Sequence, residues 1–273
     1  MRFVKMEGLG NDYLYVDLFR EQLPEPPETL AVRLSRPHFG VGADGLILIG
    51  PSDRADARMR VFNADGSEAK MCGNGIRCVG KYLYDSGRCT RETLRVDTLA
   101  GIRSLKLTIE DGVCTGAGVD MGIPVFGKTV FARAAGRDWA LQEVSMGNPH
   151  GVCLMPEPID IKLFCEAGPL LERHEAFPDR ANIEFCHAMS RTHIRVDVWE
   201  RGSGRTLACG TGACAAMATA CREGKVERRC RVTLPGGDLD ILWREDDHII
   251  MTGPARTVFT GEWPGAIRRE EHG

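Results

Sequence analysis

Short apolar or alternating runs recur along the chain at the lengths of β-strands. Clear examples lie at residues 46–49, 58–62, 105–109 and 195–199, and each is bounded by turn-forming residues. Runs of this kind predict strands, because side chains alternate between the two faces of a sheet. We therefore expect strands to dominate the fold.

Two other segments, at residues 75–84 and 212–222, have patterns compatible with α-helices. Each is followed within a few residues by a glycine, Gly87 after the first and Gly224 after the second. Glycine at or just past the last turn is a frequent helix stop, because it adopts the left-handed conformation without steric cost. The sequence thus predicts one prominent helix in each half of the chain.

A fixed shift of 137 residues matches the two halves of the chain to each other. It lays residues 71–75 (MCGNG) on residues 208–212 (ACGTG), and it carries Asn11 onto Asn148. Such self-similarity indicates a duplicated unit of about half the chain. Equivalent residues should face each other across the interface of the two halves, where ligand pockets often lie.

Patterning and duplication together predict an α+β fold of two pseudo-symmetric halves. We assign residues 1–118 to the N-terminal half and residues 119–255 to the C-terminal half, and we expect residues 256–273 to return to the N-terminal half. A chain of 273 residues is long enough for two such units, each with its own core.

Charge and hydropathy exclude several classes of partner. The formal net charge is -3, and arginines are mixed with acidic residues along the chain, which disfavours binding to nucleic acid or to an anionic membrane. No stretch approaches the roughly 18 apolar residues of a membrane span, and the first residues turn polar too soon for a signal peptide. We therefore expect a cytoplasmic protein with a small-molecule partner.

Cysteine usage favours free thiols. The chain has 11 cysteines, an odd number, and no two of them stand in a C-x-x-C spacing. A disulfide framework, structural zinc and thioredoxin-type redox chemistry are therefore poorly supported. Cys78, Cys214 and Cys221 lie in helix-like runs, where a small buried thiol is a packing residue.

Cys72 and Cys209 differ from these because each immediately precedes Gly-x-Gly at a predicted helix start. The first turn of a helix has unpaired N–H groups and a partial positive charge, so it can hold a carboxylate and lower the pKa of a nearby thiol. The glycines leave room for a ligand to approach the backbone amides. Two such helix starts aimed at one point could hold a single α-carboxylate, with the α-carbon between two sulfurs.

Two cysteines on opposite sides of an α-carbon suit inversion of that centre. One cysteine, as a thiolate, removes the proton, and the other, as a thiol, returns a proton to the opposite face. The reverse reaction uses the opposite protonation states, and the two thiols titrate as a coupled pair. The residues alone therefore predict an amino-acid epimerase or racemase that needs no cofactor.

At these motifs the chain resembles the diaminopimelate epimerase family, and the resemblance covers essentially its whole length. The matching segments are residues 5–12 (KMEGLGND), 62–67 (FNADGS), 71–75 (MCGNG), 146–150 (MGNPH), 200–202 (ERG) and 208–212 (ACGTG). The resemblance implies that each half is a mainly antiparallel curved sheet or barrel around a central helix. It also implies a cofactor-independent homodimer that interconverts L,L- and meso-diaminopimelate, for lysine and peptidoglycan synthesis.

The resemblance implies roles for individual residues as well. Cys72 and Cys209 would be the catalytic acid/base pair. The reacting α-carboxylate would be held by the backbone amides of Gly73, Asn74, Gly210 and Thr211. The other polar groups of the substrate would be bound by Asn11, Asn63, Asn148, Asn182, Glu200 and Arg201. His150 and Glu200 would support the catalytic cysteines, and Arg201 suits bidentate capture of the distal carboxylate.

One position departs from the family pattern. The shift of 137 places Gly45 opposite Asn182, where some family members carry a glutamine. We therefore expect no side-chain contact with the substrate from position 45.

Four alternatives remain. A proline or hydroxyproline racemase also pairs two cysteines, but its first motif typically has histidine where this chain has Asn74. A nucleotide-binding protein would match the G-x-G-x-x-G of residues 40–45, but here the strand-like run follows the glycines instead of preceding them. An inactive relative of the fold would not be expected to keep both cysteines. A pyridoxal-phosphate racemase would need a lysine near a motif, and only Lys70 and Lys81 lie there.

Overall fold

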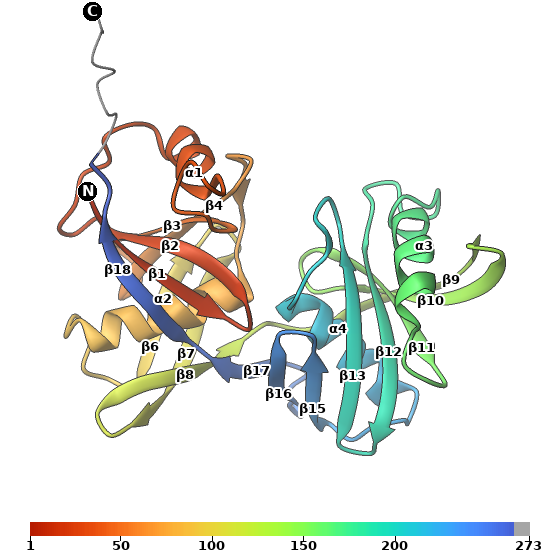
Figure 1. Cartoon of the computed structure of the whole chain (residues 1–273). Helices are drawn as coiled ribbons and strands as arrows, with labels where there is room; N and C mark the ends of the chain where they lie inside the picture. The colour runs from red at the N-terminus through yellow and green to blue at the C-terminus, as the bar shows by residue number, and fades with distance from the viewer. Residues whose placement is uncertain (265–273) are drawn as a thin grey trace, which may run out of the picture.

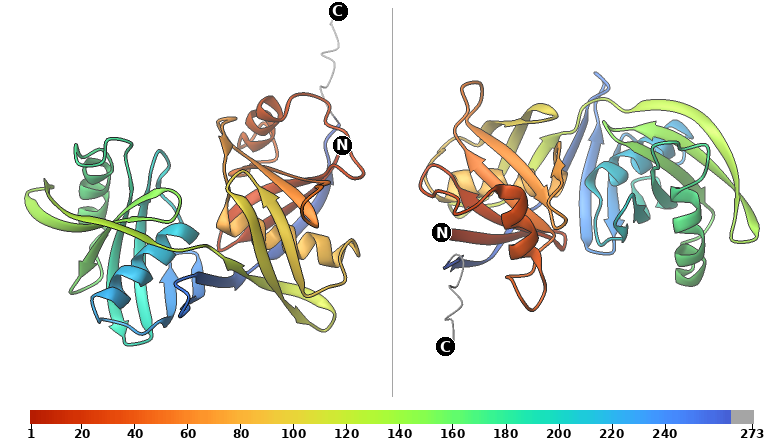
Figure 2. Two further views of the ribbon diagram at one scale, coloured as in Figure 1. Left: turned by 180° about the vertical axis from the view of Figure 1, so that it is seen from behind. Right: turned by 90° about the horizontal axis from the view of Figure 1, so that it is seen from above.

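A computed structural model describes residues 1–264 of the chain. Figure 1 shows two lobes side by side, one built around helix α2 (Gly73–Asp85) and the other around helix α4 (Gly210–Arg222). Figure 2 shows the same two lobes from behind and from above. The chain passes between the lobes where β8 (Val113–Asp120) lies beside β17 (Ile249–Pro254).

The remaining elements are divided between the lobes. Besides α2 and β8, the N-terminal lobe contains β1 (Arg2–Gly8), β2 (Asn11–Asp17), α1 (Pro27–Ser35), β3 (Gly45–Gly50), β4 (Ala57–Asn63), β5 (Glu68–Ala69), β6 (Thr93–Thr98) and β7 (Gly101–Glu110). Besides α4 and β17, the C-terminal lobe contains β9 (Val125–Ala134), β10 (Arg137–Ser145), β11 (Pro149–Met155), α3 (Ile161–Glu172), β12 (Asn182–Ser190), β13 (His193–Glu200), β14 (Gly204–Arg205), β15 (Arg229–Leu234) and β16 (Gly237–Trp243). The four strands predicted from the apolar runs are confirmed as β3, β4, β7 and β13.

The last strand, β18 (Arg256–Glu262), runs back to the N-terminal lobe and pairs with β1 in antiparallel fashion. Residues 265–273, the end of the segment expected to return there, lie outside the described residues.

The two lobes have the same strand order. In the N-terminal lobe the strands pair in the order β18-β1-β2-β3-β4-β6-β7-β8. In the C-terminal lobe the order is β9-β10-β11-β12-β13-β15-β16-β17. Each order has two parallel pairs at equivalent places, β2 with β3 and β4 with β6 in the first lobe, and β11 with β12 and β13 with β15 in the second. The predicted α+β fold of two pseudo-symmetric halves is therefore confirmed.

Each sheet curves around its helix. Helix α2 contacts β1, β2 and β18 at one end of its sheet, and it also contacts β7 and β8 at the other end. Helix α4 likewise contacts strands from β10 to β17. A helix that touches both ends of a strand order lies inside a rolled sheet, so the expected arrangement around a central helix is also confirmed.

The strands β8 and β17 join the lobes symmetrically. The shift of 137 makes Gly116 equivalent to Gly253 and Ala117 equivalent to Pro254. In the antiparallel pair, Gly116 lies opposite Pro254 and Ala117 lies opposite Gly253. Exchanging the two halves therefore leaves this pairing unchanged, as expected for a local two-fold axis between the two residue pairs.

Both predicted helices start earlier than expected. Helix α2 begins at Gly73 and α4 at Gly210, two residues before the predicted starts, because a cysteine side chain caps each first turn. Gly87 and Gly224 follow the C-caps with φ of 74° and 67°, which is the left-handed conformation that glycine favours at a helix end.

Helices α1 and α3 were not predicted, although they too occupy equivalent places in the two halves. Proline obscures both in the sequence. Helix α1 starts at Pro27, directly after Pro26, and α3 contains Pro169. Proline is compatible with the first turn of a helix but breaks the pattern expected of a helix interior. No helix within residues 1–264 is both long and apolar enough to cross a membrane.

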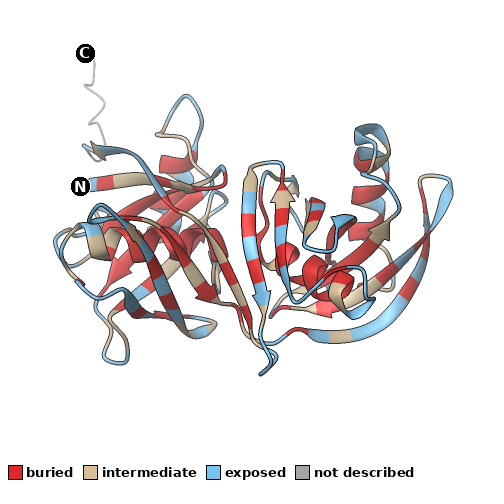
Figure 3. Ribbon diagram, turned by 90° about the horizontal axis from the view of Figure 1, so that it is seen from below, coloured by how far each residue is buried: buried red, intermediate tan, exposed pale blue. Residues whose placement is uncertain are grey.

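Buried residues lie along the inner faces of the strands and helices, as Figure 3 shows. The largest apolar cluster extends through both lobes and includes Ile76 and Val79 of α2 and Ala213 and Met217 of α4. Separate clusters hold α3 and α1 on the outer faces of their sheets. The central helices are therefore packed rigidly, and their first turns are fixed in place.

Candidate active site

Cys72 and Cys209 are the N-cap residues of α2 and α4. The sulfur of Cys72 accepts a hydrogen bond from the backbone N–H of Gly75 at 3.3 Å, and the sulfur of Cys209 accepts one from the N–H of Gly212 at 3.4 Å. Cysteine thus takes the capping role that serine or aspartate has at most helix starts. The motif Cys-Gly-x-Gly places each sulfur beside the positive end of a helix.

The two helix starts approach each other closely. A Cβ atom placed on Gly210 would lie 3.8 Å from the Cα of Gly73. The side chain of Asn74 donates a hydrogen bond to the carbonyl of Ala208 at 3.1 Å, which links the two motifs directly. The duplicated motifs therefore face each other, as the repeat predicts.

A cavity of about 800 Å³ opens between the lobes. Ala208 of the second motif and Asn11, which bonds to the sulfur of Cys72, line it, whereas Cys72, Cys209 and the rest of the first motif do not. The cavity is lined by residues of both lobes, among them six residues of the predicted substrate set: Asn11, Asn63, Asn148, Asn182, Glu200 and Arg201. A cavity at the interface of two pseudo-symmetric halves is a common location for a small-molecule site.

On the Cys72 side, a carboxylate orients the neighbouring amide. The thiol of Cys72 donates to Oδ1 of Asn11 at 3.3 Å. The Nδ2 of Asn11 donates to Oδ2 of Asp44 at 2.7 Å, and the backbone N–H of Asp12 donates to the same oxygen at 3.1 Å. Because Asp44 only accepts, it directs the carbonyl oxygen of the Asn11 amide toward the sulfur.

On the Cys209 side, a longer chain of hydrogen bonds runs away from the sulfur. The hydroxyl of Thr211 lies 3.6 Å from the sulfur and accepts from Nδ2 of Asn148 at 3.3 Å. Oδ1 of Asn148 is 3.1 Å from Nε2 of His150, and Nδ1 of His150 is 2.7 Å from Glu184. The ring of His150 and the carboxylate of Glu184 are wholly buried.

One wall of the cavity is formed by Asn182 at the start of β12, Glu200 at the end of β13 and Arg201 directly after it. Glu200 accepts a hydrogen bond from the Thr206 hydroxyl at 2.6 Å. Asn182 accepts from the backbone N–H of Arg201 at 2.9 Å and donates to the carbonyl of Pro149 at 3.2 Å. Arg201 is exposed, and its guanidinium donates to the carbonyl of Asp179 at 3.1 Å. Within residues 1–264 its other donors have no partner, so they can bind an anion in the cavity.

Burial outweighs the helix starts in setting the thiol pKa values. Burial raises the pKa of Cys72, while backbone hydrogen bonds from Gly75 and Asn74 act to lower it. The pKa of Cys209 is raised well above its ordinary value by burial and by the nearby carboxylates of Glu200 and Glu184. The expected lowering by each helix start is therefore present, but it is the smaller effect.

Position 45 has no room for a side chain. A Cβ atom on Gly45 would lie 2.1 Å from the carbonyl oxygen of Phe62 and 2.8 Å from the ring of Tyr13. The absence of a side-chain contact from this position thus follows from packing as well as from the residue type.

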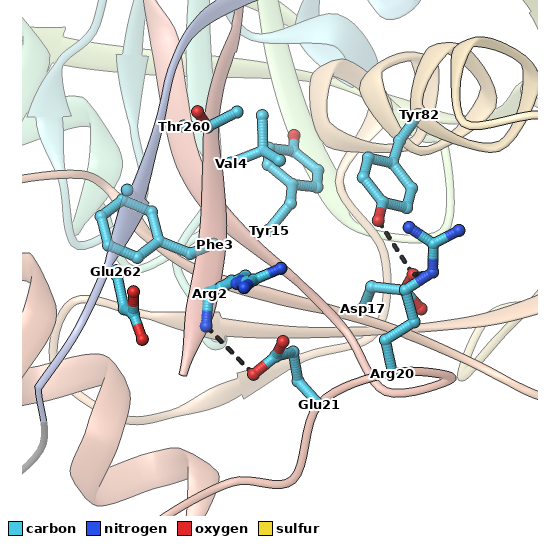
Figure 4. Close-up of a pocket in the computed structure, with 11 residues that line it drawn as sticks. Arg2, Phe3, Val4, Tyr15, Asp17, Arg20, Glu21, Tyr82, Thr260 and Glu262 are labelled. Atoms are coloured by element: carbon cyan, nitrogen blue, oxygen red, sulfur yellow. Dashed lines mark hydrogen bonds and ion pairs between the residues drawn. The ribbon is translucent and has the colours of Figure 1, made fainter.

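A separate hollow, shown in Figure 4, lies beside β1, β2 and β18. None of the predicted site residues lines it. Its polar groups already pair with one another, since the Tyr82 hydroxyl donates to Asp17 at 2.9 Å and the backbone N–H of Arg2 donates to Glu21 at 3.1 Å. We assign it no part in the chemistry.

Comparison with known proteins identifies the family of this chain. A model of the family described as diaminopimelate epimerase matches residues 3–126 and 143–258. The chain is 49% identical over 276 residues to a diaminopimelate epimerase of Acetivibrio thermocellus, and the match covers 96% of this chain and 98% of that protein. The chain belongs to the diaminopimelate epimerase family.

Other relatives place the family in a wider fold group. A diaminopimelate epimerase of Bacteroides thetaiotaomicron is 49% identical over 268 residues, with 97% of this chain and 98% of that protein covered. The crystal structure of a probable proline racemase from Agrobacterium radiobacter K84 superposes with a TM-score of 0.74 and 17% identity, and the match covers 98% of this chain and 94% of that one. At that identity the likeness shows a shared fold.

Two residues of the diaminopimelate epimerase site were not predicted from the sequence. Asp44 lies in the glycine-rich loop before β3, and Glu184 interrupts the apolar run of β12. A charged residue with apolar neighbours on both sides, such as Glu184 between Ile183 and Phe185, is a usable signal because burial of a charge requires a partner.

Proposed function

We propose that this chain interconverts L,L- and meso-diaminopimelate, with Cys72 and Cys209 as the acid and base. The observation that carries the proposal is the pair of N-capping cysteines at equivalent positions, on helix starts that lie against each other between the two lobes. Names of relatives at 49% identity support the choice of substrate.

The helix starts would bind the reacting end of the substrate. Backbone N–H groups of Gly73, Asn74, Gly210 and Thr211 would hold the α-carboxylate and stabilise the charge that develops when the proton leaves. One sulfur would then remove the α-proton, and the other would return a proton to the opposite face. Buried thiols with raised pKa values are strong bases once ionised, which suits abstraction of a weakly acidic C–H proton.

The cavity wall would recognise the rest of the substrate. Arg201 would pair with the distal carboxylate, which needs a bidentate cation. The side chains of Asn11, Asn63, Asn148, Asn182 and Glu200 line the same cavity and would bind the two amino groups and the carboxylates. His150 would hold the Asn148 amide in place from behind.

Alanine variants test the roles of the two cysteines. Cys72→Ala and Cys209→Ala should each abolish turnover of diaminopimelate while leaving the fold intact. Cys78→Ala is the matched control, because Cys78 is a buried thiol of the same helix without a proposed role. Near-normal turnover by either motif variant would refute the two-cysteine mechanism.

We also propose that the enzyme works without pyridoxal phosphate and in the cytoplasm. The two thiols supply both proton-transfer groups, so the mechanism needs no electron sink. All 11 cysteines are free, as is typical of a reducing compartment. Turnover by purified protein without a pyridoxal absorbance band, and recovery of activity in the cytosolic fraction, would test these points; a bound pyridoxal or an extracytoplasmic enzyme would contradict them.

A homodimer is a further part of the proposal. Strand β18 pairs with β1 along one edge, and no other described strand pairs with its second edge. Val258 and Phe259 on this strand are 53% and 43% exposed. An open strand edge with exposed apolar side chains is a common dimerisation surface. Sedimentation should give twice the chain mass, and Phe259→Lys should shift the equilibrium toward monomer; a monomeric wild type would refute this.

A further inference from the structure

Arg77 is a buried cation in the second turn of α2. Its side chain has no measurable exposure, and it forms no ion pair with any carboxylate of residues 1–264. It donates from Nε to the carbonyl of Pro254 at 3.1 Å and from Nη1 to the carbonyl of Gly73 at 3.2 Å, whereas Nη2 has no hydrogen-bond partner in the described part of the chain. A buried charge without a counter-charge is costly, so a protein that keeps one usually needs it.

The fold provides a dedicated space for this guanidinium. A Cβ atom on Gly8 of β1 would lie 2.9 Å from Nη2, and one on Gly253 of β17 would lie 3.2 Å from the guanidinium carbon and Nε. Two glycines on strands far apart in sequence therefore leave room for Arg77. The hydrogen bond to Pro254 also fixes the guanidinium against the strand that joins the two lobes.

The equivalent position in the other half of the chain carries no charge. The shift of 137 places Cys214 of α4, a neutral and fully buried thiol, at the position of Arg77. The converse holds for the two carboxylates. The same shift places Glu184 opposite Ile47 and Glu200 opposite Asn63, and neither of these N-terminal residues is charged. The cation of α2 therefore has no counterpart on α4, and Glu184 and Glu200 have no charged counterparts in the N-terminal half. Glu200 acts on both cysteines, whereas the charge of Glu184 acts on Cys209.

We propose that Arg77 is a positioning residue whose charge favours the thiolate of Cys72, so that Cys72 ionises before Cys209 in the free enzyme. The inference rests on the proposed acid/base role of the cysteine pair. Arg77 acts through the helix start, where it holds the Gly73 carbonyl, and through its field in a dry interior, where an opposite charge is weakly screened. Its unpartnered Nη2 leaves part of that charge uncompensated.

The other charged or titratable groups around these two residues do not replace Arg77. The charges that act on Cys72 are those of Glu200 on β13 and Arg77 on α2, and only that of Arg77 favours the thiolate. The groups that act on Arg77 are Cys78, Cys72, Tyr15 and Cys214, all of which are neutral unless they ionise. Burial raises the pKa of Cys78 to about 11, so near neutral pH this thiol does not compete with Cys72 as a counter-charge.

Alkylation of the two cysteines as a function of pH tests the proposal. Iodoacetamide labelling, followed by mass spectrometry of the peptides that contain Cys72 and Cys209, gives a separate profile for each thiol. The exposed Cys165 is replaced by serine in every sample so that it does not consume reagent. The variants are Arg77→Met, which removes the charge, and Arg77→Lys, which keeps it.

Lys81→Met is the matched control. Lys81 is a second buried cation of α2, but it is already paired with Asp85 at 2.7 Å and with the carbonyl of Cys114. Its loss removes a buried charge from the same helix without removing the cation beside Cys72. A change that follows only from a weakened helix would therefore appear in both variants.

In wild type we expect Cys72 to be labelled at lower pH than Cys209. Arg77→Met should move the Cys72 profile up by about one pH unit or more, as the loss of an adjacent opposite charge does, while Arg77→Lys and Lys81→Met should stay near wild type. Labelling of Cys209 first in the wild type, or an unchanged Cys72 profile in folded Arg77→Met, would overturn the proposal. The wild-type comparison decides the order of ionisation even if Arg77→Met does not fold. Failure of the two-cysteine mechanism would appear separately, as turnover by Cys72→Ala.

Discussion

At the scale of single residues, equivalent positions in the two halves have different neighbours. Cys72 and Cys209 were predictable from the sequence because the repeated Cys-Gly-x-Gly is a contiguous signal. Asp44 and Glu184 were not, because their contacts with the asparagines and with His150 depend on pairing between distant strands. Chemistry carried by one short motif can be predicted, whereas its supporting groups depend on the three-dimensional fold.

The charge of Glu200 gives a pH prediction. A carboxylate near Cys209 disfavours the thiolate and raises the pKa of that thiol, so Glu200→Gln should lower it. The alkylation profile of Cys209 should then move to lower pH, while turnover falls because Glu200 lines the cavity. Glu143→Gln, which removes a carboxylate from a neighbouring hollow, is the control and should leave the profile unchanged. A shift to higher pH in Glu200→Gln would show that its charge does not act on Cys209.

The buried contact between His150 and Glu184 gives a stability prediction. Both side chains are wholly buried. His150 contacts Oε1 of Glu184, and Oε2 has no hydrogen-bond partner among residues 1–264. His150→Ala leaves the carboxylate unpaired, so the free energy of unfolding should fall by at least about 3 kcal/mol in urea titrations. Arg133→Ala removes one member of an exposed ion pair and should change stability little. Equal stability of His150→Ala and Arg133→Ala would show that the buried contact contributes nothing.

At the scale of elements, apolar patterns identified the strands and central helices but not their limits. The starts of α2 and α4 depend on sulfur capping, which no propensity scale anticipates. Helices α1 and α3 are fixed by packing on the outer faces of the sheets, against clusters whose members come from several strands. In α3 these contacts outweigh the effect of Pro169 in the helix interior, whereas Pro27 at the first position of α1 is compatible with the helix.

The close approach of β8 and β17 leads to a prediction about Gly116. A Cβ atom at this position would lie 2.5 Å from the carbonyl oxygen of Gly253, which is backbone and cannot rotate away. Gly116→Ala should therefore lower the free energy of unfolding by about 1–3 kcal/mol. It should also reduce turnover, because the pairing of β8 with β17 sets the position of the two lobes relative to each other. Gly50→Ala, whose Cβ would make ordinary contact with Leu18, is the matched control. Equal stability of the two variants would contradict the close approach of β8 and β17 at Gly116.

At the scale of the whole molecule, self-similarity at a shift of 137 residues predicted two halves and a site between them. The sequence also led us to expect that residues after 255 return to the N-terminal half, where β18 pairs with β1. The pairing of β8 with β17 was not predicted, because it joins segments separated by more than a hundred residues. We propose that the boundary between the halves follows these strands, with residues 1–118 and β18 in one unit and residues 119–255 in the other. The proposed catalytic centre then draws on both halves.

The central claim is that two cysteines act on opposite faces of one carbon. Its most direct test is turnover of diaminopimelate in deuterium oxide, stopped early and analysed for label at the inverted carbon. A two-base mechanism predicts deuterium in the product from the first turnovers and almost none in the remaining substrate, because the base that removes the proton does not return it to the product. Equal labelling of substrate and product, as a single exchanging base would give, would contradict the account.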